Sequence, residues 1–184
     1  MIITGFDIGI KNFAFVILDV KNMDMTLENV AEAFDIIHFE NINLQTTAKV
    51  RANHMDEIFR NLYQVLDTFR TLWDDCNVFL IEQQMQYRHA SNIKALKLSQ
   101  HVLSYFYIHY PSSNILEYPA YHKTQIWRAP PKLLKHQRKT WAISKVKELL
   151  EKKGMGNIMD DFKKKDDISD CILMALSYVM QNNN

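Results

Sequence analysis

A short apolar run in the middle of the chain constrains the fold more than any other feature of the sequence. Val78-Phe79-Leu80-Ile81 contains no polar residue and is followed at once by Glu82. A run this short is too brief for a buried helix and is typical of a strand that is covered on both faces. The chain is therefore expected to build a sheet with helices on both sides.

The other segments surround this strand in a regular order. Residues 2–8 and 12–20 are rich in β-branched and aromatic residues, and Gly9-Ile10-Lys11 between them predicts a tight hairpin. Further strands are predicted over residues 35–41 and 114–118, a loop over 119–131, and helices over 46–72, 91–109, 136–152 and 166–180. This order predicts an α/β fold in which residues 1–184 form one domain: a mixed five-stranded sheet, its first three strands antiparallel, flanked by helices.

The small net charge of +1 hides a strong polarity along the chain. Residues 1–120 carry 9 Lys/Arg and 14 Asp/Glu, whereas residues 122–153 carry 10 Lys/Arg and 2 Asp/Glu. A basic block beside a part rich in carboxylates suits a polyanionic ligand held near a metal site, although a solvated helix face would give the same count.

Some classes of protein are excluded by the patterns that are missing. The chain has four glycines, Gly5, Gly9, Gly154 and Gly156, and they form neither a P-loop nor a dinucleotide-binding motif. Its longest apolar runs, residues 13–18 and 171–176, are too short to span a bilayer, and its first residues lack the basic region of a secretory signal. We therefore expect an intracellular protein with no membrane contact.

The cysteines also argue for an intracellular chain. Cys76 and Cys171 are expected to be two buried thiols rather than a disulfide framework. No Cys/His group has the spacing of a zinc site.

Four carboxylates stand where a metal site could form. Asp7 ends the first predicted strand, and Glu82 ends the apolar strand. Asp167 and Asp170 lie three residues apart on one face at the start of the last helix. If these elements are neighbours, the four acids meet, and without cations they raise one another's pKa by repulsion.

Clustered carboxylates provide the hard oxygen ligands that Mg²⁺ and Mn²⁺ prefer. Two such ions, about 4 Å apart, support attack of water on a phosphodiester by activating the water and stabilising the leaving 3′ oxygen. Asp7, Glu82, Asp167 and Asp170 are therefore predicted to be metal ligands and catalytic residues. Taken singly, a strand-end acid is often a surface cap, and an Asp-x-x-Asp pair often interacts with the helix dipole. Asp166 is an alternative to Asp167.

Three motifs resemble those of the RuvC-type Holliday junction resolvases, in the branch found in poxviruses and fungal mitochondria. They are Phe6-Asp7-Ile8-Gly9-Ile10-Lys11-Asn12, Ile81-Glu82-Gln83-Gln84, and Lys164-Lys165-Asp166-Asp167-Ile168-Ser169-Asp170. The resemblance spans nearly the whole chain, with the motifs in order and at fitting separations.

This resemblance implies a ribonuclease H-like fold and a homodimer that nicks four-way DNA junctions symmetrically with Mg²⁺. Asp7, Glu82, Asp167 and Asp170 match the acids of the family's metal site. Because the family has viral members, the resemblance also implies that the protein acts in the cytoplasm of an infected host cell. The stretch from Leu116 to Gln125, which includes Lys123, resembles a segment that approaches DNA in the family.

The basic block offers further contacts to DNA. Its Lys and Arg side chains would neutralise phosphates, and an exposed Trp would stack on an unpaired base at a branch point. Trp127 is open to DNA contact or to packing, whereas Trp141 is expected in the core. The predicted DNA contacts are Lys11, Asn12, Gln83, Gln84, Lys123, Trp127, Arg128, Lys132, Lys135, Arg138, Lys139, Lys164 and Lys165.

Other functions fit the sequence less well. A kinase or an actin-like phosphotransferase also opens with Asp-x-Gly, but it needs a second domain and a glycine-rich loop. A transposase or integrase usually ends its acid set with Glu, whereas the last helix here carries Asp only. A ribonuclease H-like nuclease of broader DNA or RNA specificity and a non-catalytic module that binds branched DNA stay open, although a pure binder gains nothing from clustered acids facing DNA.

Overall fold

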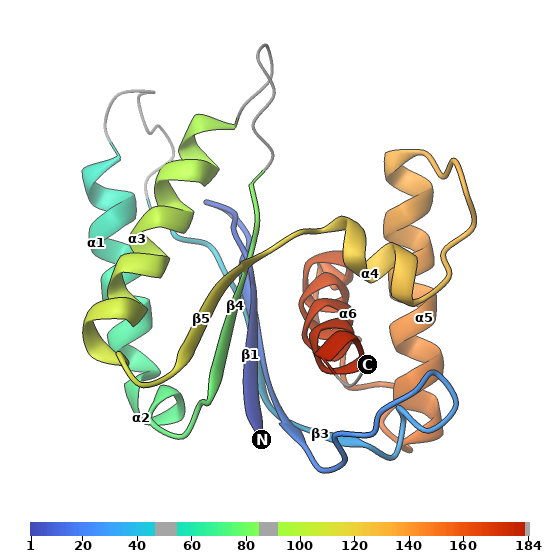
Figure 1. Cartoon of the computed structure of the whole chain (residues 1–184). Helices are drawn as coiled ribbons and strands as arrows, with labels where there is room; N and C mark the ends of the chain where they lie inside the picture. Colours follow the sequence, from blue (N-terminus) through green and yellow to red (C-terminus); the bar gives the residue numbers. More distant parts are fainter. Residues whose placement is uncertain (47–54, 85–91, 183–184) are drawn as a thin grey trace.

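A five-stranded mixed sheet forms the centre of the computed structural model, which describes residues 1–46, 55–84 and 92–182. The strand order is β3-β2-β1-β4-β5 (Figure 1). The strands are β1 (Ile2–Asp7), β2 (Phe13–Val20), β3 (Phe34–Ile42), β4 (Val78–Glu82) and β5 (Asn114–Tyr118). The first three pair antiparallel, as the sequence predicted, and β4 lies parallel to both β1 and β5, which makes the sheet mixed.

Helices cover both faces of this sheet (Figure 1). One face carries α1 (Asp56–Thr68), α2 (Arg70–Trp73) and α3 (Ile93–His109), and the other carries α4 (Tyr121–Ile126), α5 (Lys135–Lys152) and α6 (Lys165–Asn182). Alternate residues of β4 enter the two cores: Leu80 packs with α5 and α6, whereas Phe79 and Ile81 pack with α1 and α3. This arrangement explains why the β4 run is apolar throughout.

The face beneath α1 to α3 is unusually aromatic. Phe6 lies with its ring centroid 5.3 to 5.9 Å from those of Phe13, Phe15, Trp73 and Phe106. Pairs of rings at these separations add a directional attraction to the burial of apolar area.

Two predicted segments differ from the structure. The predicted helix over 46–72 is divided into α1 and α2, because the backbone of Phe69 leaves the helical region at φ −97° and ψ 14°; residues 47–54 lie outside the described part. The predicted loop over 119–131 is wrong for Tyr121–Ile126, which form α4. Six residues between prolines are too few to show helical periodicity, and packing against α6 stabilises them instead.

The expectation for the two cysteines is met. Cys76 and Cys171 are both free and buried. In the described part of the chain, none of the helices combines the length and apolarity needed to cross a membrane.

Gly5 allows α6 to lie unusually close to β1. A Cβ atom at this position would be 2.8 Å from the carbonyl oxygen of Cys171 and 3.3 Å from Cε of Met174. Because the nearer atom belongs to the helix backbone, it cannot rotate away as a side chain would. Gly5 therefore sets the distance at which the start of α6 approaches the end of β1.

We predict that Gly5→Ala lowers the free energy of unfolding by about 2 kcal/mol, because α6 must move outward. The melting temperature should fall by roughly 4 to 8 °C, measured by thermal unfolding. Gly156→Ala is the control, since its Cβ would meet only the flexible side chain of Glu151. Equal stability of the two variants would show that the close approach at Gly5 is unimportant.

Candidate active site

Asp7 and Glu82 meet at one edge of the sheet because β1 and β4 are parallel neighbours. Their register pairs Phe6 with Ile81, so the next residue on each strand is an acid. Strands that run in the same direction end at the same edge, where ligands of α/β folds commonly bind. This pairing brings together two acids that are 75 residues apart in sequence.

The start of α6 adds Asp167 and Asp170 to the same edge. Burial raises the pKa of Asp7 well above its ordinary value, and the charges of Glu82, Asp170 and Asp167 raise it further. Burial likewise raises the pKa of Asp170. Asp7 therefore lies within electrostatic reach of the other three acids.

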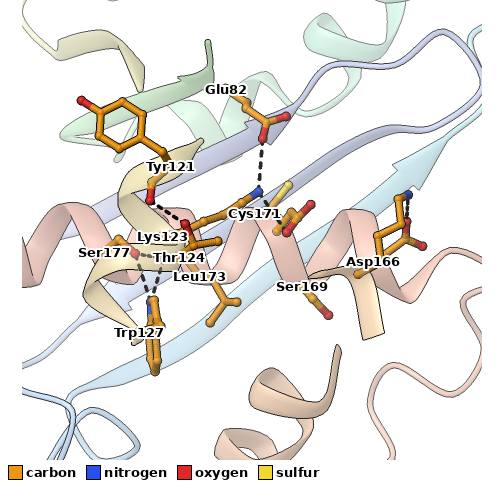
Figure 2. A network of polar contacts seen from close by, with 12 residues as sticks. Glu82, Tyr121, Lys123, Thr124, Trp127, Asp166, Ser169, Cys171, Leu173 and Ser177 are labelled. Atoms are coloured by element: carbon orange, nitrogen blue, oxygen red, sulfur yellow. Dashed lines mark hydrogen bonds and ion pairs between the residues drawn. The ribbon is translucent and has the colours of Figure 1, made fainter. Parts of the chain in front are cut away.

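Lys123 lies among these acids and carries a counter-charge. Its Nζ donates to Oε1 of Glu82 at 3.1 Å and lies 2.9 Å from Oδ1 of Asp170 (Figure 2). Burial alone would lower the pKa of this ammonium, but the charges of Glu82 and Asp170 raise it above its usual range. Lys123 is therefore a permanently charged bridge inside the acid cluster.

Asp166 and Asp167 are neighbours in sequence but differ in their surroundings. Asp166 forms an ion pair with Lys139; burial would raise its pKa, but this pair holds the pKa below its ordinary value. Burial and the charge of Asp166 raise the pKa of Asp167, which accepts a hydrogen bond from Nδ2 of Asn41 at 3.2 Å. Only Asp167 of the two faces the pocket described next, so the geometry favours Asp167 as the ligand.

The acids face a pocket of about 930 Å³. Its acidic lining comes from the ends of β1 and β4 and from α6, and further lining residues come from the start of α5. Seven of the predicted DNA contacts line it with the acids: Asn12, Gln83, Gln84, Lys123, Lys135, Arg138 and Lys139. Tyr121 and the half-buried Trp141 also line the pocket.

The remaining predicted contacts have other positions. Lys11 and Lys164 are exposed outside the pocket lining, and Lys165 pairs with Asp160 at 2.6 Å. Arg128 and Lys132 line a second hollow, described below.

The prediction that Trp127 contacts DNA is wrong. The side chain is 3% exposed, and its indole N–H donates to Oγ of Ser177 at 3.0 Å and to the carbonyl of Leu173 (Figure 2). The ring therefore packs between α4 and α6, and it has no open face on which a base could stack.

Sequence reasoning missed two features of the site. Lys123 was predicted to approach DNA, but its ion pairs with Glu82 and Asp170 depend on α4, which was predicted as loop. Asn41, at the end of the third strand, gave no signal at all. The only sign of the Lys123 ion pairs in the sequence was that this lysine follows the end of a predicted strand.

The donor set of this site fits hard divalent cations, because carboxylate oxygens predominate among its polar atoms. Among the described residues, no group of three Asp, Glu, His or Cys side chains is already arranged to hold a metal ion. Lys123 instead offsets part of the charge of Glu82 and Asp170. A cation held by these two acids would compete with the ammonium for their oxygens.

The fold is that of the RuvC-type Holliday junction resolvases. RuvC of Thermus thermophilus is 16% identical, with a TM-score of 0.65 over 99% of this chain and 95% of that protein. The fowlpox virus resolvase bound to Holliday junction DNA is 18% identical, with a TM-score of 0.64 over 99% of each chain. The yeast mitochondrial Holliday junction resolvase Ydc2 is 17% identical, with a TM-score of 0.63 over 98% and 80% of the two chains.

Sequence comparison identifies the family of this chain more specifically than the fold does. Residues 1–182 match the family described as Poxvirus A22 protein, and the chain belongs to this family. Uncharacterized protein 97L of Invertebrate iridescent virus 3 is 29% identical over 96% of this chain and 98% of its own length. Uncharacterized protein 170L of Invertebrate iridescent virus 6 is 28% identical over 96% and 87%. The resemblance seen in the three motifs is thereby confirmed.

We predict that Asp7→Asn raises the metal-free melting temperature at pH 7 by roughly 2 to 4 °C. A carboxyl whose pKa is raised by folding destabilises the native state progressively above the ordinary value of 3.8, because the unfolded chain releases the proton freely there, whereas the folded protein must keep it or hold an unfavourable charge. The gain should therefore shrink as the pH falls towards 4. Thermal unfolding in EDTA measures it, with the exposed Asp24→Asn as control. A lower melting temperature for Asp7→Asn would contradict the predicted repulsion.

Replacing the bridging lysine should have the opposite effect. Lys123→Gln leaves Glu82 and Asp170 without their counter-charge, so we predict a loss of about 2 kcal/mol in metal-free stability. Added Mg²⁺ should raise the melting temperature of this variant more than that of the wild type, because the cation replaces the missing charge. An equal response of both proteins to Mg²⁺ would mean that the ion does not bind where Lys123 acts.

Proposed function

We propose that residues 1–184 act as one nuclease domain that cuts four-way DNA junctions with the help of divalent cations. One observation carries the proposal: Asp7, Glu82, Asp167 and Asp170 line a single pocket together with the cations Lys123, Lys135, Arg138 and Lys139. These cations would match the negative charge of a DNA phosphate that enters the pocket. Membership of the Poxvirus A22 protein family and the resolvase fold both support this reaction.

The four acids are the proposed ligands of two Mg²⁺ or Mn²⁺ ions, which would activate a water and stabilise the leaving 3′ oxygen. The chain itself positions the phosphate. Lys135, Arg138 and Lys139 from α5 line the same pocket as the acids, so they are suited to hold the strand near the bond that is cut.

Lys123 has a proposed double role. In the metal-free protein its ammonium lowers the repulsion between Glu82 and Asp170. Once cations provide that charge, Nζ can turn to a phosphate oxygen while it stays in the same pocket. A lysine suits this exchange because its charge is compact and its stem is flexible.

The substrate is proposed to be branched DNA read by shape and charge. Amides of Asn12, Gln83 and Gln84 and cations of α5 dominate the polar lining outside the acids, and these groups recognise the backbone rather than base sequence. The exposed Lys11 and Lys164 are further proposed phosphate contacts near this edge.

A homodimer follows from the proposed reaction, since a four-way junction has two symmetric strands to cut and this chain has one acid pocket of this kind in its described part. On helix α3, the apolar side chains of Ile93, Tyr107 and Ile108 are exposed, which is consistent with a contact between the two copies at this helix. The named relatives are viral, so the cytoplasm of an infected cell is the proposed location.

Purified protein is expected to nick a synthetic four-way junction in Mg²⁺ or Mn²⁺ and to stop in EDTA, as followed by gel electrophoresis of labelled strands. Asp7→Asn should lower the rate at least about 1000-fold while junction binding persists, because only the metal site is damaged. Asp24→Asn is the matched control. Equal cutting of linear duplex or of RNA would replace the resolvase by a nuclease of broader specificity, and binding without any metal-dependent cutting would leave a non-catalytic binding module.

A further inference from the structure

A second, smaller hollow of about 410 Å³ lies beside the acid pocket. It is formed by the end of α4, the segment that leads to α5, and the first turn of α5. Its charged lining consists of Arg128, Lys132 and Arg138, and no acid lines it. Three cations around one concave surface form a strongly positive site.

These cations have no acidic partners in the described part of the chain. By contrast, Lys145, Lys147 and Lys152, farther along α5, each pair with Glu148 or Glu151. No Asp or Glu occurs between Glu117 and Glu148, so an acidic partner for these cations would have to come from another element, as it does for Lys123 and Lys139. The charge of the hollow is thus free to act on a ligand.

The backbone holds two of these cations in an uncommon conformation. Arg128 has φ 53° and Lys132 has φ 59°, the left-handed region that residues with a Cβ atom seldom adopt. Pro130 and Pro131 stiffen the segment between them. Backbone strain of this kind concentrates at ligand sites, where the surrounding structure imposes it.

The packing of Trp127 holds the backbone that follows it in this conformation. Its buried indole is hydrogen-bonded to Ser177 of α6, and the following N–H groups of Arg128 and Ala129 donate to the carbonyls of Gln125 and Thr124. The backbone of Arg128 is therefore attached directly to an anchored residue, so the point from which its exposed side chain extends is fixed before any ligand arrives.

The hollow adjoins the acid pocket. Thr124 and Arg138 line both of them. A strand whose phosphate occupies the acid pocket can therefore extend along α4 into the hollow. Among the described residues, no aromatic side chain lines the hollow, so a stacked base is not the ligand that it fits.

We infer that this basic hollow, formed by Arg128, Lys132 and Arg138, binds a backbone phosphate of the branched DNA at a distance from the bond that is cut. The inference rests on the proposed function. Guanidinium groups and an ammonium around a preformed concavity match the oxygens of a phosphodiester. The hollow then determines the direction in which a junction arm leaves the acid pocket.

The test compares two double variants that remove the same charge. Arg128→Gln with Lys132→Gln alters the hollow, whereas Lys147→Gln with Lys152→Gln alters the distant half of α5. Binding of a labelled four-way junction is measured by fluorescence anisotropy in EDTA over a range of salt concentrations. The hollow variant should bind about tenfold more weakly than the wild type, with a salt slope smaller by about 1, because one phosphate contact is lost. The control should change by less than about twofold.

A second form of the variant separates lost charge from lost folding. Arg128→Gly with Lys132→Gly removes both charges but favours the left-handed backbone, so its melting temperature should match that of the wild type while junction binding falls equally. Arg128→Lys with Lys132→Arg should retain most of the affinity.

The outcomes are distinct. If wild type, control and both hollow variants bind the junction with equal affinity and salt slope, the inference that the hollow binds a phosphate is overturned and the proposed function stands. If the control weakens binding as much as the hollow variants do, the contact is unspecific and the inference is again overturned. If the wild type does not bind a junction at all, the proposed function fails and the inference fails with it.

Discussion

The two ion pairs of Lys123 are the interaction on which the acid cluster depends. Asp7, Glu82 and Asp170 meet at one edge of the sheet, and the raised pKa values of Asp7 and Asp170 reflect the cost of placing them there. An ammonium contributed by α4 offsets part of that cost. The negative charge that destabilises the metal-free protein is also the charge that attracts divalent cations, so stability and the proposed function oppose each other at this edge.

The scaffold positions this cluster through backbone contacts more than through side-chain chemistry. The parallel pairing of β1 with β4 places Asp7 beside Glu82, and the missing side chain of Gly5 lets α6 approach closely enough to add Asp170. Trp127 then fixes α4 to α6, which directs Lys123 into the acids. Each step joins elements that are distant in sequence, so an error in any one of them would separate the charges.

The basic block illustrates how the same residue type serves different purposes within one segment. Lys123 and Lys139 pair with acids at the sheet edge, and Lys147 and Lys152 pair with acids of their own helix. Arg128 and Lys132 keep their charge for the second hollow. The sequence showed the excess of positive charge, but a count of charges could not divide these groups, because their partners lie on other elements.

The sequence by itself determined the order of the strands and of the longer helices, the mixed sheet and the four candidate acids, since apolar periodicity and a carboxylate at a strand end are local features. It could not show α4, because six residues carry too little periodicity and are stabilised by contacts with α6. Only the tertiary structure decided that Asp167 rather than Asp166 faces the pocket, that Trp127 is buried, and that Lys123 bridges Glu82 and Asp170. Each of these depends on which distant atoms occupy the surrounding few ångströms, and pairwise distances of that kind are fixed by packing and not by any local run of residues.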